Sequence, residues 1–114
     1  MPVDIGLAEL DRLVGDGALL IEVLPSGEYE EEHLPHAINI PLRDLTAESV
    51  AHIDRATPVV VYCWDSLGDM SQRAACQLDR YGFAHVSDFV YGKAYWLASG
   101  RATVRATRGD RVLD

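Results

Sequence analysis

The most strand-like stretch of the chain reads Pro58-Val59-Val60-Val61-Tyr62-Cys63. Its β-branched and aromatic residues favour an extended backbone, and a run without polar alternation is typical of a strand buried on both faces of a parallel sheet. A loop at residues 64–70 follows, and Ser71 is expected to cap a helix that runs to Tyr81 and ends at Gly82. Residues 59–81 are therefore predicted to form a unit of strand, loop and helix.

Strands and helices alternate on both sides of this unit. Apolar runs that end at a turn predict strands at residues 18–23, 37–40 and 86–90. Apolar positions with helical spacing predict helices at residues 5–14, 46–53 and 93–99. Asp4 and Thr46 are the expected caps of the first two of these helices. The alternation predicts an α/β domain with three layers, in which a mainly parallel sheet of about five strands is flanked by helices.

The composition is that of an ordinary globular domain without a positive surface. The chain has 114 residues, 48% of them hydrophobic, and carries a formal charge of −8 from 18 acidic and 10 basic residues. Nucleic-acid binding and polybasic membrane binding both need a dense positive field, so both are excluded. No apolar run approaches the roughly 18–20 residues of a membrane helix, and the N-terminus does not resemble a secretory signal. Two cysteines are too few for a disulfide scaffold, so the expected compartment is a reducing cytoplasm.

The C-terminal residues differ from the rest of the chain in charge. Residues 101–114 hold four of the ten basic residues and two of the eighteen acidic ones, so they carry +2 while residues 1–100 carry −10. Val104, Val112 and Leu113 lie among these arginines. We therefore expect one domain at residues 1–100 and a C-terminal tail at residues 101–114. The tail either forms an extension or adds a strand to a partner or to a second copy of the chain.

Cys63 is the candidate nucleophile, because ligands in α/β proteins bind beyond the carboxyl ends of the strands. Backbone N–H groups of the loop and the dipole of the following helix would hold an anion there and stabilise a thiolate. The alternative is that Cys63 is a buried structural cysteine, a common role for free cysteines. Cys76 lies nearly opposite Leu78 on its helix and is expected to be a partly exposed, inert thiol.

Two other site chemistries are excluded by spacing. His33 and His36 stand three positions apart, but Pro35 disfavours a helix and no further ligands complete a zinc set, so no metal is expected. A cysteine phosphatase needs an arginine six positions after its cysteine to clamp the phosphoryl oxygens. In this chain Asp69 stands six positions after Cys63.

Several motifs, in order and with characteristic spacing, resemble the rhodanese domain family. The first half is carried by Ile21-Glu22-Val23 and by the run from His33 to Leu42, and the second half by Val59–Cys63, Tyr81-Gly82-Phe83 and Gly92 to Trp96. The resemblance covers roughly residues 3–100. It implies the rhodanese fold and a sulfurtransferase that uses neither a metal nor an organic cofactor.

The resemblance assigns roles to individual residues. Cys63 stands at the nucleophile's position, where it would take a sulfane sulfur from thiosulfate or a persulfide and pass it to cyanide or another thiol. His33, Pro35 and Trp96 match structural positions of the family. The substrate-binding loop would consist of Trp64, Asp65, Ser66, Leu67, Gly68, Asp69, Met70 and Ser71. A small anionic sulfur donor and a thiol acceptor are the implied partners, and the loop position of Trp64 favours a lid over the pocket.

The same loop departs from the family's pattern. The common loop runs Cys-x-x-Gly-x-Arg-Ser, whereas here Ser71 follows Cys63 by eight positions and the arginine is missing. Asp65 and Asp69 place two negative charges where an anionic donor should bind, and like charges oppose both thiolate and donor. Some relatives with a long loop carry a second cysteine where this chain has Gly68.

Two further departures lie outside the loop. The strand-end Asp-x-Arg of many members is Glu22-x-Leu24 here, so a second basic residue is gone, and His36 and Tyr91 stand where glycine is usual. Two hypotheses therefore remain open. The chain is either an active sulfurtransferase or a catalytically inactive rhodanese-like module that binds or regulates a protein partner, and a homodimer fits either one.

Overall fold

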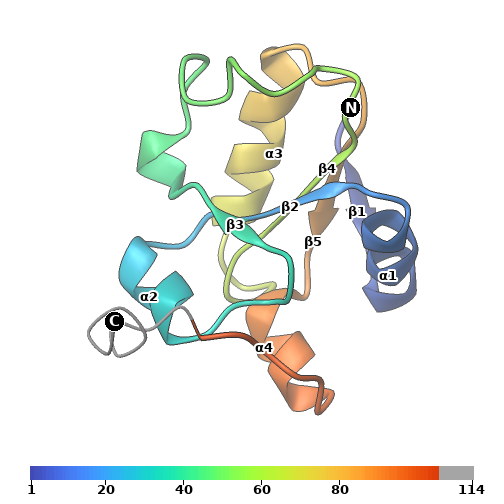
Figure 1. Cartoon of the computed structure of the whole chain (residues 1–114), viewed down its shortest axis with the longest axis vertical. Helices are drawn as coiled ribbons and strands as arrows, with labels where there is room; N and C mark the ends of the chain where they lie inside the picture. The colour runs from blue at the N-terminus through green and yellow to red at the C-terminus, as the bar shows by residue number, and fades with distance from the viewer. Residues whose placement is uncertain (106–114) are drawn as a thin grey trace, which may run out of the picture.

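The centre of the molecule is a sheet of five parallel strands in the order β1-β5-β4-β2-β3, seen in the computed structural model of residues 1–105 (Figure 1). The strands are β1 (Val3–Ile5), β2 (Leu19–Glu22), β3 (Ile38–Asn39), β4 (Val59–Tyr62) and β5 (Val86–Phe89). In the central pairing, Leu20 of β2 lies beside Val60 of β4, and Val60 lies beside Ser87 of β5. The predicted parallel sheet is confirmed, and β4 lies at its centre.

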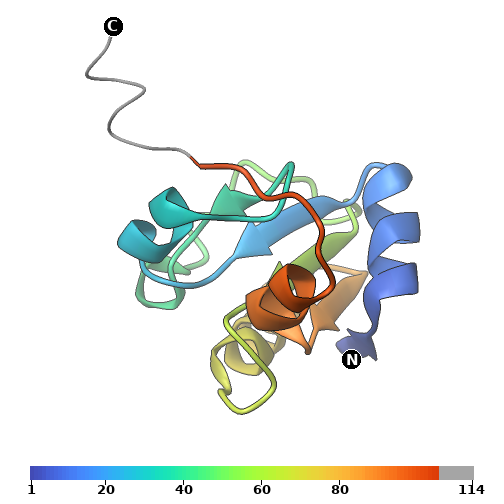
Figure 2. The ribbon, with the colours of Figure 1, turned by 90° about the horizontal axis from the view of Figure 1, so that it is seen from below.

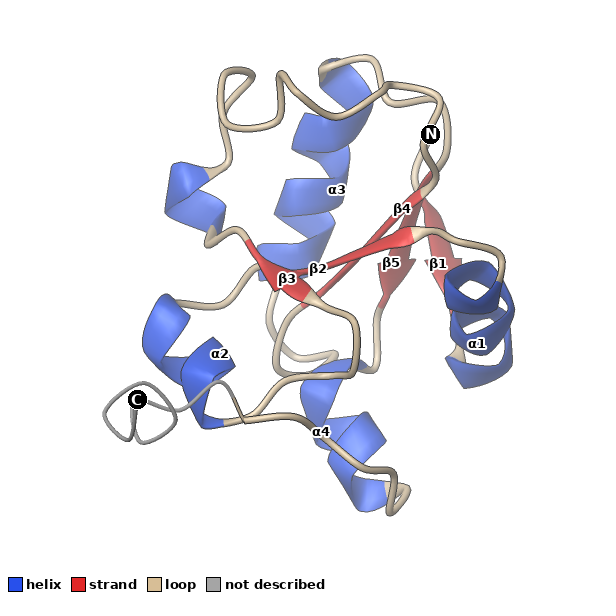
Figure 3. Cartoon of the chain, in the orientation of Figure 1, coloured by secondary structure: helices blue, strands red, loops and turns tan. Residues whose placement is uncertain are grey.

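Helices cover both faces of this sheet, which makes the fold three-layered (Figures 2 and 3). They are α1 (Leu7–Gly15), α2 (Ser26–Glu31), the short 3-10 helix η1 (Leu42–Asp44), α3 (Met70–Arg80) and α4 (Gly92–Ala98). The core clusters place α3 on one face of the sheet and α1 and α4 on the other. Within residues 1–105, none of the helices has the length and apolarity needed to cross a membrane.

The alternation of β4 divides the apolar core into two parts. Val59, Val61 and Cys63 pack with residues of α3, whereas Val60 and Tyr62 pack with residues of α1 and α4. All four residues of β4 are buried. β4 lacks polar alternation because both of its faces are covered, as the sequence predicted.

The predicted helix at residues 5–14 is wrong at its start. Residues 3–5 form the edge strand β1, in which Asp4 pairs with Asp88 of β5, and the helix begins at Leu7 after Gly6. Asp4 is therefore not the helix cap. A strand of three residues shows no periodicity of its own, and its extended backbone is held by pairing with β5.

The predicted helix at residues 46–53 is absent, and this segment forms successive turns. Thr46 and Ser49 bond each other reciprocally: the Thr46 Oγ1 accepts from the Ser49 N–H at 3.0 Å, and the Ser49 Oγ accepts from the Thr46 N–H at 2.9 Å. These side chains satisfy the backbone locally, which competes with a regular helix. Val50 is nevertheless fully buried, so its apolar position reports burial rather than helical structure.

The first residues of the predicted tail return to the domain. His33 and Val104 form an antiparallel bridge, in which each backbone N–H donates to the other residue's carbonyl oxygen at 2.9 Å. Residues 106–114, where the rest of the predicted tail lies, are outside the described residues. A strand added by the tail to a partner or second copy therefore stays a prediction.

Candidate functional site

Cys63 lies directly after β4, and the residue is 3% exposed. Its Sγ lies 3.4 Å from the Ser71 Oγ and 3.7 Å from the Asp65 carbonyl oxygen. Ser71 is buried in the first turn of α3, whose N-cap position is Asp69, so Ser71 does not cap the helix as predicted. Its hydroxyl instead faces the sulfur, which ties the start of the helix to the end of the strand.

The loop between them is held partly by its own carboxylates. The Asp65 carboxylate accepts a hydrogen bond from the Leu67 N–H at 3.0 Å, so this amide is already occupied. Asp69 makes no capping hydrogen bond, and its carboxylate lies 4.0 Å from the guanidinium of Arg73, with both side chains exposed. Such an exposed pair contributes little to stability. The negative charge that the sequence predicted near Cys63 is therefore present.

The remaining predicted loop residues differ in exposure. Ser66 and Gly68 are exposed, and Met70 is half-buried. Trp64 is 45% exposed and Leu67 93% exposed, so the loop presents two large apolar side chains to solvent. Trp64 is therefore not a core residue, and its role as a lid stays a prediction.

The N-terminus of α4 holds the beginning of the loop. The Lys93 N–H donates to the Cys63 carbonyl oxygen at 3.0 Å, and the Ala94 N–H donates to the Trp64 carbonyl oxygen at 2.8 Å. Gly92 has a φ of +69°, and a Cβ atom there would lie 2.7 Å from the Trp64 oxygen and 2.8 Å from the Cys63 oxygen. The backbone of Cys63 and Trp64 can therefore approach α4 closely because residue 92 is glycine.

We expect Gly92→Ala to displace the start of the loop. The new methyl group meets backbone atoms that cannot move aside, so the free energy of unfolding should fall by about 2–3 kcal/mol. In a Cys76→Ser background, Cys63 should react about tenfold faster with iodoacetamide, because local opening exposes it. Urea unfolding and the alkylation rate measure the two effects.

Gly17→Ala is the matched control for this substitution. Gly17 also has a positive φ, +98°, but a Cβ atom there would meet nothing within 4 Å. It should cost only the conformational strain, about 1 kcal/mol, and leave the reactivity of Cys63 unchanged. Equal effects of the two variants would show that the contact with residues 63 and 64 is unimportant.

A buried ionic network lies on the opposite side of the sheet from Cys63. The Glu22 carboxylate lies 3.0 Å from the Lys93 Nζ and accepts a hydrogen bond from the Tyr62 hydroxyl at 2.7 Å. Lys93 also donates to the Glu28 carbonyl oxygen at 3.0 Å, and the Tyr62 hydroxyl accepts from the Leu34 N–H at 3.1 Å. Burial raises the pKa of Glu22, although the hydrogen bonds from Tyr62 and Lys93 oppose the shift. Burial and the Glu22 charge raise the pKa of Tyr62.

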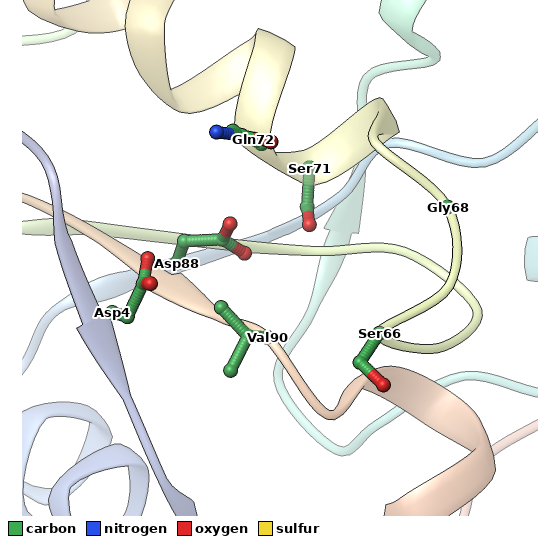
Figure 4. Close-up of a pocket in the computed structure, with 7 residues that line it drawn as sticks. All are labelled: Asp4, Ser66, Gly68, Ser71, Gln72, Asp88 and Val90. Atoms are coloured by element: carbon green, nitrogen blue, oxygen red, sulfur yellow. The ribbon is translucent and has the colours of Figure 1, made fainter.

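A cavity of about 280 Å³ lies beside the loop (Figure 4). Its lining is mostly polar and consists of Asp4, Ser66, Gly68, Ser71, Gln72, Asp88 and Val90. The Asp88 carboxyl group extends from β5 toward Ser71. Burial raises the pKa of Asp88, a hydrogen bond with Ser71 lowers it, and the nearby Asp4 charge raises it further. Ser71 thus lies between this acidic cavity and the sulfur of Cys63.

A second hollow, of about 470 Å³, has the opposite charge. It lies by the first turns of α3, where Met70 and Arg73 line it together with Arg43 from η1. Apolar residues, among them Val23 and Leu45, form part of its wall. This hollow carries the positive charge that the loop itself lacks.

His33 and Trp96, which the resemblance assigns to structural positions, both pack in the interior of the domain. His33 is buried, its Nδ1 lies 2.9 Å from the Tyr29 carbonyl oxygen, and its ring stacks on Tyr29. Trp96 is packed in the core and donates from Nε1 to the Ala102 carbonyl oxygen at 3.0 Å. His36 has a φ of +71°, the conformation for which glycine is usual. Among residues 1–105, no three potential metal ligands of the His, Cys, Asp or Glu type cluster together.

Sequence reasoning missed Lys93 and Asp88. Each carries a weak signal, because each is a charged residue inside a segment of otherwise apolar and small residues. The signal does not say what the charge contacts, since Glu22 and Lys93 stand 71 positions apart. Cys76 is free and exposed and lies outside the site.

Comparisons with known proteins point to one family. A family model described as the rhodanese-like domain matches residues 7–99. The thiosulfate sulfurtransferase GlpE of Coxiella burnetii is 31% identical over 80 residues, which cover 70% of this chain and 72% of that protein. The adenylyltransferase and sulfurtransferase UBA4 of Saccharomyces cerevisiae is 31% identical over 80 residues, which cover 61% of this chain. The match spans only 18% of the UBA4 chain.

The fold is also that of a solved structure. The crystal structure of the BH2092 protein from Bacillus halodurans has a TM-score of 0.84 with this chain, at 19% sequence identity. The superposition covers 98% of this chain and 90% of that one. At this level of identity the likeness concerns the fold alone.

Proposed function

Because the chain belongs to the rhodanese-like domain family, we propose that it is a sulfurtransferase that carries a sulfane sulfur as a persulfide on Cys63. The donor is thiosulfate or a persulfide, and the acceptor is a thiol or cyanide. One observation carries the proposal: the Cys63 sulfur lies at the end of the central strand, 3.4 Å from the Ser71 hydroxyl at the start of α3. The two unpaired cysteines agree with the reducing cytoplasm that the sequence predicts.

The reaction needs two displacements at sulfur. The Cys63 thiolate attacks the outer sulfur of thiosulfate, an S–S bond forms, and sulfite leaves with the electron pair of the broken bond. An acceptor thiolate then attacks the same sulfur, and the Cys63 thiolate leaves. The N–H groups at Met70, Ser71 and Gln72 have no carbonyl four residues earlier within α3, so they are free to bind negative charge that develops in this loop.

The hollow lined by Arg43 and Arg73 favours an anionic donor on that side of α3.

Intact-mass analysis tests the proposal directly. The protein is incubated with thiosulfate, or with a persulfide donor, and then with cyanide. We expect a gain of one sulfur atom on Cys63 that cyanide removes. No gain, with Cys63 still alkylated in the folded protein, would contradict the proposal.

Asp69→Arg is expected to increase the activity with thiosulfate about tenfold in kcat/KM. The substitution replaces a negative charge by a positive one just before α3, one residue before Met70, which stands where the family's loop carries an arginine. Asp69 makes no capping hydrogen bond, so its loss should not unfold the helix. Sulfite release at several thiosulfate concentrations measures the effect.

Asp69→Asn is the control that separates lost repulsion from gained attraction. It removes one charge without adding another, so its increase should be smaller than that of Asp69→Arg. A neutral persulfide donor should respond little to either substitution, because it carries less charge for the loop to repel or attract. Equal responses of both donors would mean that charge at position 69 does not act on the donor.

The exposed side chains of Trp64 and Leu67 support a second candidate, an inactive module that binds a protein partner through the loop. This candidate predicts no sulfur gain with any donor. It also predicts that capture of a partner depends on the charges of Asp65 and Asp69. If neutralising both residues leaves capture unchanged, this candidate fails.

A further inference from the structure

The cavity beside the loop contains a buried carboxyl group with an unmet hydrogen-bonding capacity. Asp88 is 3% exposed, and among residues 1–105 its Oδ1 has no hydrogen-bond partner. An unpartnered buried acceptor is uncommon in proteins, because removing it from water is costly. The group lies in the wall of a cavity that is large enough for a small ligand. Figure 4 shows it beside Asp4 and below Ser71.

The lining of the cavity is suited to a positive group. Pairing of β1 with β5 places Asp4 opposite Asp88, so two carboxyl groups face the same space. The Ser66 and Ser71 hydroxyls and the Gln72 amide add further acceptors, and among residues 1–105 no lysine, arginine or histidine lines the cavity. Ionisation of Asp88 is opposed by its burial and by the charge of Asp4. A bound cation would offset both effects.

An ammonium group fits these acceptors better than a metal ion. Two carboxyl groups with hydroxyls and an amide supply hydrogen-bond acceptors for N–H donors. They do not make up a cluster of three His, Cys, Asp or Glu ligands, and no such cluster is found within residues 1–105. The acids Asp65 and Asp69 of the neighbouring loop attract the same charge.

The position of the cavity connects it to the sulfur. Ser71 lines the cavity, and its Oγ lies 3.4 Å from the Cys63 Sγ. Ser66 and Gly68 of the loop form another part of the wall. A ligand whose amine lies at Asp88 can therefore place a thiol, joined by a short carbon linker, near the loop that holds Cys63.

We propose that this cavity binds the ammonium group of an aminothiol, and that the thiol of this molecule is the acceptor of the sulfur on Cys63. The inference rests on the proposed function, because it names the acceptor class. The acceptor thiolate forms a bond to the outer sulfur of the Cys63 persulfide. The bond between that sulfur and the Cys63 Sγ breaks, and the electron pair returns to Sγ. The products are the aminothiol persulfide and the Cys63 thiolate, and no external oxidant or reductant is needed.

The first experiment compares two acceptors on protein that already carries the persulfide. The rate of sulfur loss is followed by intact mass with cysteamine and with 2-mercaptoethanol, and the ratio of the two rates is taken for each variant. The intrinsic reactivities of the thiols cancel when ratios are compared between variants. We expect Asp88→Asn to lower the ratio about tenfold and the exposed Asp4→Asn to lower it about threefold. Asp44→Asn, an exposed acid of η1 outside the cavity, makes the same change in net charge and should not alter the ratio.

The second experiment does not depend on sulfur transfer. Ethanolamine, an amine without sulfur, is titrated into the protein, and amide chemical shifts are recorded by NMR. We expect shifts at Ser66, Gly68, Ser71 and Gln72 that are lost in Asp88→Asn. An absence of shifts, together with an unchanged ratio of the two acceptor rates in Asp88→Asn, would overturn the inference. If no persulfide forms, the proposed function fails, and the titration alone decides whether the cavity binds an amine.

Discussion

Cys63→Ser is expected to abolish the gain of sulfur from thiosulfate and from persulfide donors. The serine hydroxyl is not ionised near neutral pH and cannot hold a persulfide, so neither displacement can occur. Cys63 lines neither of the two hollows beside α3, so the substitution removes the proposed reacting sulfur and leaves the residues that line both hollows in place. Intact mass after donor treatment, and sulfite release, measure the loss.

Cys76→Ser is the matched control, because it changes the same side chain at the other free cysteine. Cys76 is exposed on α3, away from the loop, so this variant should keep full activity. Circular dichroism of both variants shows whether either substitution alters the fold. Equal activity of the two variants would refute the assignment of Cys63 as the nucleophile.

Lys93→Met is expected to lower the free energy of unfolding by about 3–5 kcal/mol. Lys93 is 2% exposed and Glu22 is fully buried, and their charged atoms lie 3.0 Å apart. When the lysine is removed, the buried Glu22 carboxylate keeps one side-chain hydrogen-bond partner among residues 1–105, the Tyr62 hydroxyl. Urea unfolding monitored by tryptophan fluorescence measures the effect.

The loss in Lys93→Met should depend on pH. Burial already raises the pKa of Glu22, and the lysine opposes this shift, so its removal raises the pKa further. The folded state then keeps a proton that the unfolded state releases above a pKa of about 4.3. The stability of the variant should therefore fall as the pH rises through the interval between the unfolded and the folded pKa.

The double variant Glu22→Gln, Lys93→Met is the control for this prediction. It removes both charges, and a neutral amide can still accept the hydrogen bond from Tyr62. We expect it to recover most of the stability and to lose the pH dependence. A single variant that unfolds within about 1 kcal/mol of the wild type, at every pH, would show that the pair contributes little.

The predicted order of strands and helices was confirmed except at β1 and at residues 46–53. The apolar run of β4, the Gly82 that follows α3 and the alternation of elements all depend on neighbouring residues, so they can be recognised locally. The two errors have the opposite origin. β1 depends on pairing with β5, and the segment at residues 46–53 contributes Val50 to the core without forming a helix.

The features of the candidate site also fall into those that depend on neighbouring residues and those that depend on distant ones. The position of Cys63 after the central strand, the acidic loop and the approach of Ser71 follow from residues close together in the chain. The roles of Gly92, Lys93 and Asp88 do not, because each depends on a contact with a distant segment.

The α/β fold class and the candidate nucleophile can be predicted from the order of residues alone, because hydrophobic periodicity and strand-end position are local properties. Which charges meet depends on how distant segments pack. Glu22 and Lys93 come together because β2 and α4 pack on one face, and Asp4 and Asp88 because β1 pairs with β5. Electrostatic interaction depends on distance and burial, and the folded chain determines both.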